Sequence, residues 1–236
     1  MILHQFLPNF MGKLPLVTML IFIIMGPIFS GTTQSKADSG SKVIERHRYR
    51  ETTGEDSFIF IWERVSSDDI RIRTTSSREI HVNDCQESGE TLAWYLKSET
   101  CHVNAHRQYQ SICLSGYFEN EKINKCYTIG HDHWYQAPSW ALRQFVLSKR
   151  KNVDFYMIRQ DKLRPIKLMA TKDDPGTLLL NGQEVKAFRV RLTLTGFKKK
   201  LWHGQYWFRQ SDGAFLQYKG VNGLPGTPET VIRLQD

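Results

Sequence analysis

Apolar and polar residues alternate in short segments along most of the chain after residue 42. Segment 188–195 is the clearest example, because every second residue is apolar and the residues between are arginines and threonines. This period of two is typical of a β-strand with one buried face. Segment 58–62 is apolar throughout, which favours a strand that is buried on both faces. Further strands are predicted, at intervals of about ten residues, at 70–74, 80–82, 91–96, 102–107, 111–117, 122–128, 153–158, 163–170, 178–180, 206–209, 215–218 and 230–234.

One segment, 139–148, departs from this alternation. Ser139 stands where a helix N-cap is expected, directly before a run with helical spacing. One face of that helix would gather its apolar residues, which are Trp140, Ala141, Phe145 and Val146. We therefore predict a mainly β fold, a curved antiparallel meander sheet or half-barrel, with one helix at about 139–148.

The N-terminal part of the chain carries a predicted secretory signal. No charged residue occurs between Lys13 and Lys36, and residues 14–29 are almost wholly apolar. This stretch is shorter than the ~20 residues that cross a bilayer and is interrupted by proline, so a cleaved signal is favoured over a permanent transmembrane helix. Met11 is an alternative start. We predict a signal peptide at 1–30, a disordered linker at 31–42 and a single β-rich domain at 43–236, in a protein that is exported to the periplasm or secreted.

The cysteines lie close together in the exported part, at Cys85, Cys101, Cys113 and Cys126. In an oxidising compartment, an even and clustered set without a C-x-x-C pair predicts disulfides, with free buried thiols or a metal site as the alternatives. If strands 111–117 and 122–128 form a hairpin, Cys113 lies directly opposite Cys126. We therefore predict the disulfide Cys113–Cys126 and, by elimination, Cys85–Cys101.

The chain is basic, with 32 Lys and Arg residues against 24 Asp and Glu residues and a formal net charge of +8. The excess charge is spread out, and its local runs at 149–151 and 198–200 are typical of solvated hairpin tips or helix ends. A nucleic-acid footprint would require a continuous basic stripe with interleaved aromatic residues. We therefore expect no nucleic-acid partner, and an anionic membrane surface or a polysaccharide is the alternative partner for the charge.

His131 and His133 form the most conspicuous pair of candidate metal ligands. On an extended segment both point to the same side, with Asp132 facing away, and a third ligand would have to come from His102 or His106. An exposed turn before the helix is the favoured interpretation. Since the chain also lacks a G-x-S-x-G nucleophile motif, we predict no catalytic residue, no metal and no cofactor, in a protein that is not an enzyme.

The order of these segments resembles that of exported half-barrel families, namely the periplasmic lipoprotein carriers LolA and LolB and the DUF3108-type proteins. The segments that carry the resemblance are GETLAWYLKSETCHVNAHRQYQSICLSG in the meander and WHGQYWFRQSDGAFLQYKG near the C-terminus. The resemblance implies a sheet that is curled over an apolar concavity, which in some of these families carries acyl chains.

The sequence thus predicts an exported, non-catalytic binding protein for an apolar or amphiphilic, lipid-like ligand or an envelope component. The candidate ligand-binding residues are Trp134, Trp140 and Phe145, because the helix would cover or border the opening of the concavity. A structural or protein-interaction module of the envelope is the alternative function. A metal-dependent hydrolase that uses His131 and His133 is less favoured.

Overall fold

The computed structural model describes residues 42–65, 70–221 and 227–235. The predicted signal peptide, 1–30, and all but the last residue of the predicted linker, 31–42, lie outside these residues. The described strands are β1 (Val43–Thr53), β2 (Asp56–Val65), β3 (Ile70–Ser76), β4 (Glu79–Cys85), β5 (Thr91–Ser98), β6 (Cys101–Gln108), β7 (Ser111–Phe118), β8 (Glu121–Thr128), β9 (His133–Trp134), β10 (Asn152–Arg159), β11 (Arg164–Lys172), β12 (Gly176–Leu180), β13 (Gln183–Leu194), β14 (His203–Arg209), β15 (Phe215–Val221) and β16 (Glu229–Leu234). The described helical segments are α1 (Pro138–Leu147) and a short 3-10 helix, η1 (Gly196–Lys200).

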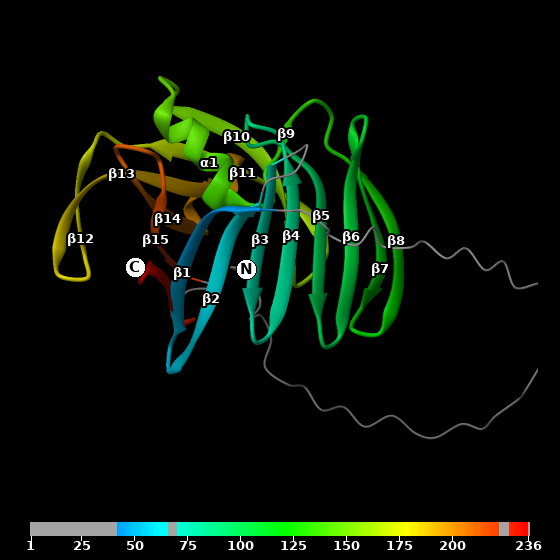
Figure 1. Cartoon of the computed structure of the whole chain (residues 1–236). Helices are drawn as coiled ribbons and strands as arrows, with labels where there is room; N and C mark the ends of the chain where they lie inside the picture. Colours follow the sequence, from blue (N-terminus) through cyan, green and yellow to red (C-terminus); the bar gives the residue numbers. More distant parts are fainter. Residues whose placement is uncertain (1–41, 66–69, 222–226, 236) are drawn as a thin grey trace, which may run out of the picture.

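The described strands join into one large sheet (Figure 1). Strands β1 to β8 form an antiparallel meander in which each strand pairs with the next. The chain then returns so that β16 pairs with β1, and β15, β14, β13, β11, β10 and β9 continue the sheet on that side, with β12 attached to β13. Because β8 and β9 remain at opposite edges, the sheet is curved and unclosed. The predicted mainly β fold, with a curved antiparallel sheet and one α-helix, is confirmed.

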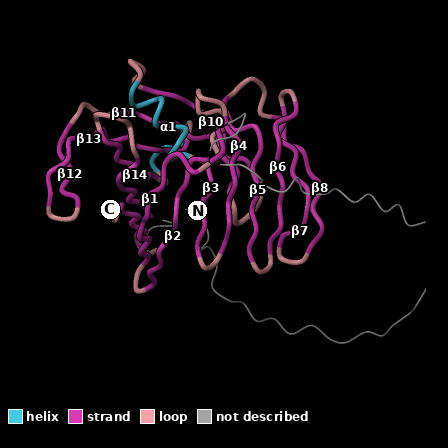
Figure 2. The backbone as a smooth tube through the Cα atoms, viewed as in Figure 1, coloured by secondary structure: helices cyan, strands magenta, loops and turns pink. Residues whose placement is uncertain are grey.

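Helix α1 packs on one face of the sheet, which we call the inner face (Figure 2). Its Trp140, Leu142 and Phe145 are buried in a cluster with Tyr49 of β1 and Tyr218 of β15. Burial of each such large side chain contributes roughly 2–3 kcal/mol of transfer free energy. Packing of its apolar face on the sheet therefore accounts for most of the stability of this ten-residue helix.

A second apolar cluster brings distant strands of the sheet together. Trp94 of β5, Val103 of β6 and Leu114 of β7 pack with Trp134 of β9 and Ile158 of β10. These strands stand at opposite ends of the strand order. Their burial against one another is the reason that the sheet curls instead of remaining open and flat.

A glycine sets the distance between the helix and the β4–β5 turn. Gly89 has a φ of +92°, and a Cβ atom there would lie 2.6 Å from the Cα of Ala141. Both the left-handed backbone and the contact exclude any larger residue. The turn therefore fits directly against α1.

An ion-pair network fixes the other side of the helix to β1. Arg143 of α1 donates to both carboxylate oxygens of Glu45, at 3.1 and 2.8 Å, and His47 lies 2.9 Å from the same carboxylate. Burial alone would raise the pKa of Glu45, but the hydrogen bonds from His47 and Arg143 outweigh it and lower the pKa to about 2. The ionised form of Glu45 is thus the one that the fold requires.

The predicted serine cap of the helix is wrong. Helix α1 begins at Pro138, its N-cap is Ala137, and no side chain caps it. Ser139 lies within the first turn, where its hydroxyl accepts a hydrogen bond of 3.1 Å from the indole N–H of Trp62. Proline suits the first helical position because it has no N–H to leave unpaired.

In the described part of the chain, no helix combines the length and the hydrophobicity that a membrane crossing demands.

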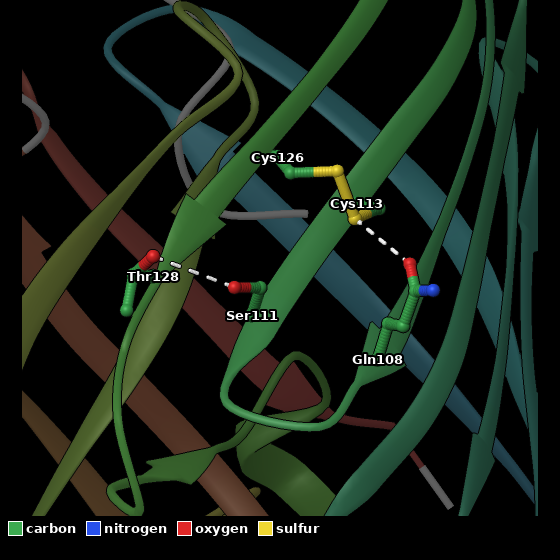
Figure 3. The surroundings of a disulfide bond; sticks show 5 residues. All are labelled: Gln108, Ser111, Cys113, Cys126 and Thr128. Atoms are coloured by element: carbon green, nitrogen blue, oxygen red, sulfur yellow. Dashed lines mark hydrogen bonds between the residues drawn. A yellow bond between two sulfur atoms is a disulfide. The ribbon is translucent and has the colours of Figure 1, made fainter.

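The disulfide Cys113–Cys126 is confirmed, whereas the second predicted disulfide is wrong. Cys113 and Cys126 are opposed in the β7–β8 hairpin with a Cα–Cα distance of 4.0 Å, beside a hydrogen bond between Ser111 and Thr128 (Figure 3). Cys85 and Cys101 are buried thiols. Cys85 pairs in register with Thr91 at the start of β5, but Cys101 begins β6 beyond the far end of β5. A strand of this length separates them by roughly 20 Å, which no disulfide spans.

Candidate functional site

The three residues predicted from the sequence to bind a ligand are buried. Trp134 lies in the cluster of β5–β7 with β9 and β10, and Trp140 and Phe145 lie in the cluster under α1. The indole N–H of Trp134 donates to Gln136 at 3.1 Å. None of the three lines the cavity described next. They are close to it in sequence, and their part in ligand binding stays a prediction.

A cavity of about 60 Å³ lies on the inner face, beside the first turn of α1. Its apolar wall is largely aromatic and includes Phe60, Trp62, Tyr206, Phe215 and Ile232, together with Ala137 and Pro138. Its polar wall includes Thr74, His81, Asn83, Gln136 and Ser139. The cavity therefore combines one apolar side with one side that can form hydrogen bonds.

Strand register places these side chains together. Trp62 of β2 is opposite Thr74 of β3, which is opposite His81 of β4. Asn83 follows two residues later on β4, so it points to the same face. On the opposite wall, Ile232 of β16 belongs to the row that runs through β15 to Tyr206 of β14. The cavity is thus built from strands that are far apart in the sequence.

The polar wall is held by specific hydrogen bonds. The indole N–H of Trp94 donates to Nδ1 of His81 at 3.3 Å, and Nε2 of His81 lies 2.9 Å from a carboxylate oxygen of Glu79. Because Nδ1 accepts, the proton of a neutral His81 resides on Nε2, the ring nitrogen that is near Glu79. Gln136 is fixed by its side-chain hydrogen bonds to both backbone groups of Ile158.

Asn83 differs from these neighbours. It is 4% exposed, and its side-chain oxygen has no hydrogen-bond partner among the described residues. A buried polar atom without a partner costs roughly 1–3 kcal/mol. Since this atom borders a cavity, a bound water or ligand group that donates a hydrogen bond would recover that cost.

Glu51 and Tyr218 form a second set of buried polar groups next to the cavity. Glu51 of β1 is opposite Ile232, which is opposite Tyr218 of β15, so the three share the inner face. Glu51 is 7% exposed, and neither its Oε2 nor the hydroxyl of Tyr218 has a hydrogen-bond partner among the described residues. Burial, with a smaller effect of the nearby Glu79, raises the pKa of Glu51 to about 7. Burial likewise raises the pKa of Tyr218, and the charge of Glu51 raises it further.

The predicted histidine pair does not gather further ligands. His131 is 3.0 Å from Nε2 of Gln110, and Nδ1 of His133 is 2.8 Å from a carboxylate oxygen of Glu90. Over the described ranges, no group of three or more His, Cys, Asp or Glu side chains is arranged to hold a metal ion. The structure instead uses His133 and Glu90 to tie the segment before α1 to the start of β5.

Comparisons with known proteins identify the fold of this chain. No protein-family model and no curated protein matches the chain. The crystal structure of a beta-barrel-like protein from Brucella abortus, a domain of unknown function named DUF1849, aligns with 81% of this chain and 95% of its own, at 7% identity and a TM-score of 0.54. The hypothetical lipoprotein YmcC from Escherichia coli aligns with 82% of this chain and 88% of its own, at 12% identity and a TM-score of 0.41. The first of these shows that the chain has a barrel-like fold.

Sequence reasoning missed the cavity residues because β4 is inverted. Its polar residues Glu79, His81 and Asn83 are buried on the inner face, whereas Ile80 is exposed on the outer face. Alternation gives the period of a strand but does not say which set points inward. The available signal was the composition of 79–83, in which amide, imidazole and carboxyl groups all fall on one side of the strand.

Proposed function

We propose that this chain is an exported binding protein, without catalysis of its own, that takes one polar end of an amphiphilic ligand into the cavity between β2–β4, β14–β16 and α1. The observation that carries the proposal is the inverted strand β4, which points His81 and Asn83 into an aromatic-lined cavity. Core strands normally bury their apolar side. A site for a hydrogen-bonding ligand requires such an inner polar face, and here the side-chain oxygen of Asn83 has no partner among the described residues.

The size of the cavity limits what enters it. A cavity of about 150 Å³ holds benzene, so about 60 Å³ holds a head group or a chain end. The remainder of the ligand would lie outside the cavity or would displace α1 from the inner face. In the second case, Trp140 and Phe145 would contact the apolar tail. This is the role that the sequence suggested for the helix.

Export is part of the proposal. The Cys113–Cys126 disulfide supports an oxidising compartment, such as a periplasm or the exterior. A narrower relation to the LolA, LolB or DUF3108-type carriers is a further part of the proposal, and the barrel-like fold is compatible with it.

Two measurements test the function. Native mass spectrometry of the mature protein, purified from an oxidising compartment, should show an extra mass that disappears on denaturation. Titration with dodecyl maltoside below its micelle threshold should change the tryptophan fluorescence, because Trp62 lines the cavity. Asn83→Leu should weaken that binding by about tenfold through the loss of one hydrogen bond. The control Asn104→Leu changes an asparagine exposed on β6 and should have no effect. If neither measurement detects a bound molecule, the proposal is wrong.

A separate observation favours interaction with an envelope partner as the second candidate function. In and after η1, Phe197 is 90% exposed and Leu201 is 66% exposed, next to the exposed Lys199 and Lys200. Contiguous exposed apolar patches with a polar rim mark interaction sites, and we propose that Phe197 and Leu201 form such a patch. Site-specific photo-crosslinking from position 201 in cells should then capture one defined partner, with position 179 on the distant β12 as the control. Equal or no capture at both positions would rule this candidate out.

A further inference from the structure

The chemistry around the cavity is selective for one charge. The residues that line it include no lysine and no arginine in the described part of the chain. Two acidic side chains neighbour its lining residues: Glu79 lies 2.9 Å from His81, and Glu51 is opposite Ile232 in the sheet. The side-chain oxygen of Asn83, which lines the cavity, has no hydrogen-bond partner among the described residues. A positively charged head group is attracted by these two carboxyl groups when they are ionised, whereas an anionic one is repelled by them.

Glu51 is the acid best placed to meet such a group. It is opposite two aromatic or apolar positions in the sheet, Phe58 on β2 and Ile232 on β16, and Ile232 lines the cavity. Its Oε2 is buried and has no hydrogen-bond partner among the described residues. Glu79, by contrast, already lies 2.9 Å from His81. A buried carboxylate that lacks a partner is destabilising unless a positive group or a proton joins it.

The aromatic wall favours an organic cation over a metal ion. Phe60, Trp62, Tyr206 and Phe215 line the cavity, and aromatic faces attract ammonium groups through their quadrupoles. A metal ion would need several oxygen or nitrogen ligands converging on one point, which the described residues do not offer. An ammonium group is also small enough for about 60 Å³.

Resting on the proposed function, we infer that the head group bound in the cavity is an organic cation, an ammonium group carried by an alkyl chain, with Glu51 as its counter-ion. The aromatic side chains surround the cation, Asn83 accepts from it where it carries N–H, and the chain leaves the cavity. No bond is made or broken.

Binding of the cation is coupled to the ionisation of Glu51. Glu51 faces Glu79, Tyr206 and Tyr218, with Arg78 and Asp56 at the rim. Arg78 is held by Asp56 through two hydrogen bonds of 2.7 Å and does not neutralise Glu51 directly. A proton and the ligand cation compete for the same carboxylate. The affinity for the cation should therefore fall by up to about tenfold for each pH unit below the pKa of Glu51, which is about 7.

Three probes with the same alkyl chain separate the possibilities. Dodecylammonium, dodecyl maltoside and dodecyl sulfate are titrated into the mature protein below their micelle thresholds, at about pH 8 and about pH 6, values on either side of the pKa of Glu51, which is about 7. The ammonium probe should bind at least about tenfold more tightly than the maltoside at the higher pH, and this preference should shrink at the lower pH. Calorimetry in buffers of different ionisation enthalpy should show that binding near neutral pH releases protons.

Variants identify the counter-ion. Glu51→Gln should reduce the preference for ammonium over maltoside to near equality and remove its pH dependence. The matched control is Glu63→Gln, because Glu63 is equally buried but faces away from the cavity and is paired with Arg73. Its preference for the ammonium probe should be that of the wild type. The pH and proton-release measurements use the wild type, so they decide the question even if Glu51→Gln fails to fold.

The outcomes distinguish the two proposals. Equal affinity for the ammonium and maltoside probes at both pH values, or a preference for the sulfate, overturns the cation inference and leaves the binding function standing. Failure of all three probes to bind overturns both.

Discussion

Replacing Glu51 with glutamine should make the ligand-free protein more stable at neutral and alkaline pH. Glutamine has nearly the same shape as glutamate and cannot ionise. The pKa of Glu51 is raised from 4.5 to about 7 in the folded protein because the carboxyl is buried. A tenfold change in an ionisation equilibrium is worth about 1.4 kcal/mol, so holding Glu51 ionised in the folded state costs about 3 kcal/mol.

The sign of the effect follows from where the proton is bound. Below about pH 4.5, Glu51 is protonated in both the folded and the unfolded chain, and its ionisation has no effect on stability. Between that pH and about pH 7, the unfolded chain releases the proton while the folded chain keeps it. Stability therefore falls as pH rises through this window, and it stays lower above the folded pKa. Glutamine removes this loss.

Urea unfolding of both proteins at several pH values measures the effect. The difference in unfolding free energy between Glu51→Gln and the wild type should grow from acid to alkaline pH by up to about 3 kcal/mol. Any constant cost of the new amide cancels in this comparison. A difference that is the same at every pH would refute the reasoning, because it would mean that Glu51 titrates as it does in the unfolded chain.

Three further predictions concern the scaffold. Glu45→Gln should destabilise the protein at neutral pH by about 2 kcal/mol, and the loss should vanish as pH falls from 4.5 toward the folded pKa of about 2. Urea unfolding of the control Glu184→Gln, at an exposed position of β13, should show no change at either pH. Thiol labelling of the unfolded, unreduced chain should modify Cys85 and Cys101 alone, and the double change of Cys113 and Cys126 to serine should lower the unfolding free energy by about 3 kcal/mol. Labelling of all four cysteines would disprove the pairing. Gly89→Ala should lower the free energy of unfolding, measured by thermal denaturation, by at least about 2 kcal/mol, because the new Cβ clashes with α1. The control Gly130→Ala should cost much less, because Gly130 is also left-handed but has open space around it. Equal losses would show that only the backbone angle matters.

Local patterns in the sequence were sufficient to predict the strands, the helix and the pairing of neighbouring strands in a hairpin. The alternating segment 188–195 overlaps β13 (Gln183–Leu194) except for its last residue, and the segment 91–96 falls within β5 (Thr91–Ser98). The pairing of Cys113 with Cys126 was also predictable, because a tight hairpin fixes which residues face each other. These features depend on residues a few positions apart.

The second cysteine pair shows where local reasoning ends. Elimination joins Cys85 to Cys101 only if the two lie close together. Their separation depends on β5, which runs its full length between them. The serine cap failed for a similar reason, since Ser139 is used by Trp62 from a strand far away in the sequence.

By itself the sequence determined that this chain is mostly strands with one helix, because a period of two or of 3.6 is a local property. Only the tertiary structure decided which face of each strand is buried. The chain returns so that β16 pairs with β1, and the sheet curls under α1. As a result Glu51, His81 and Asn83 point inward and Ile80 points outward. The physical reason is that strand alternation is the same on either face, and only long-range packing excludes water from one of them.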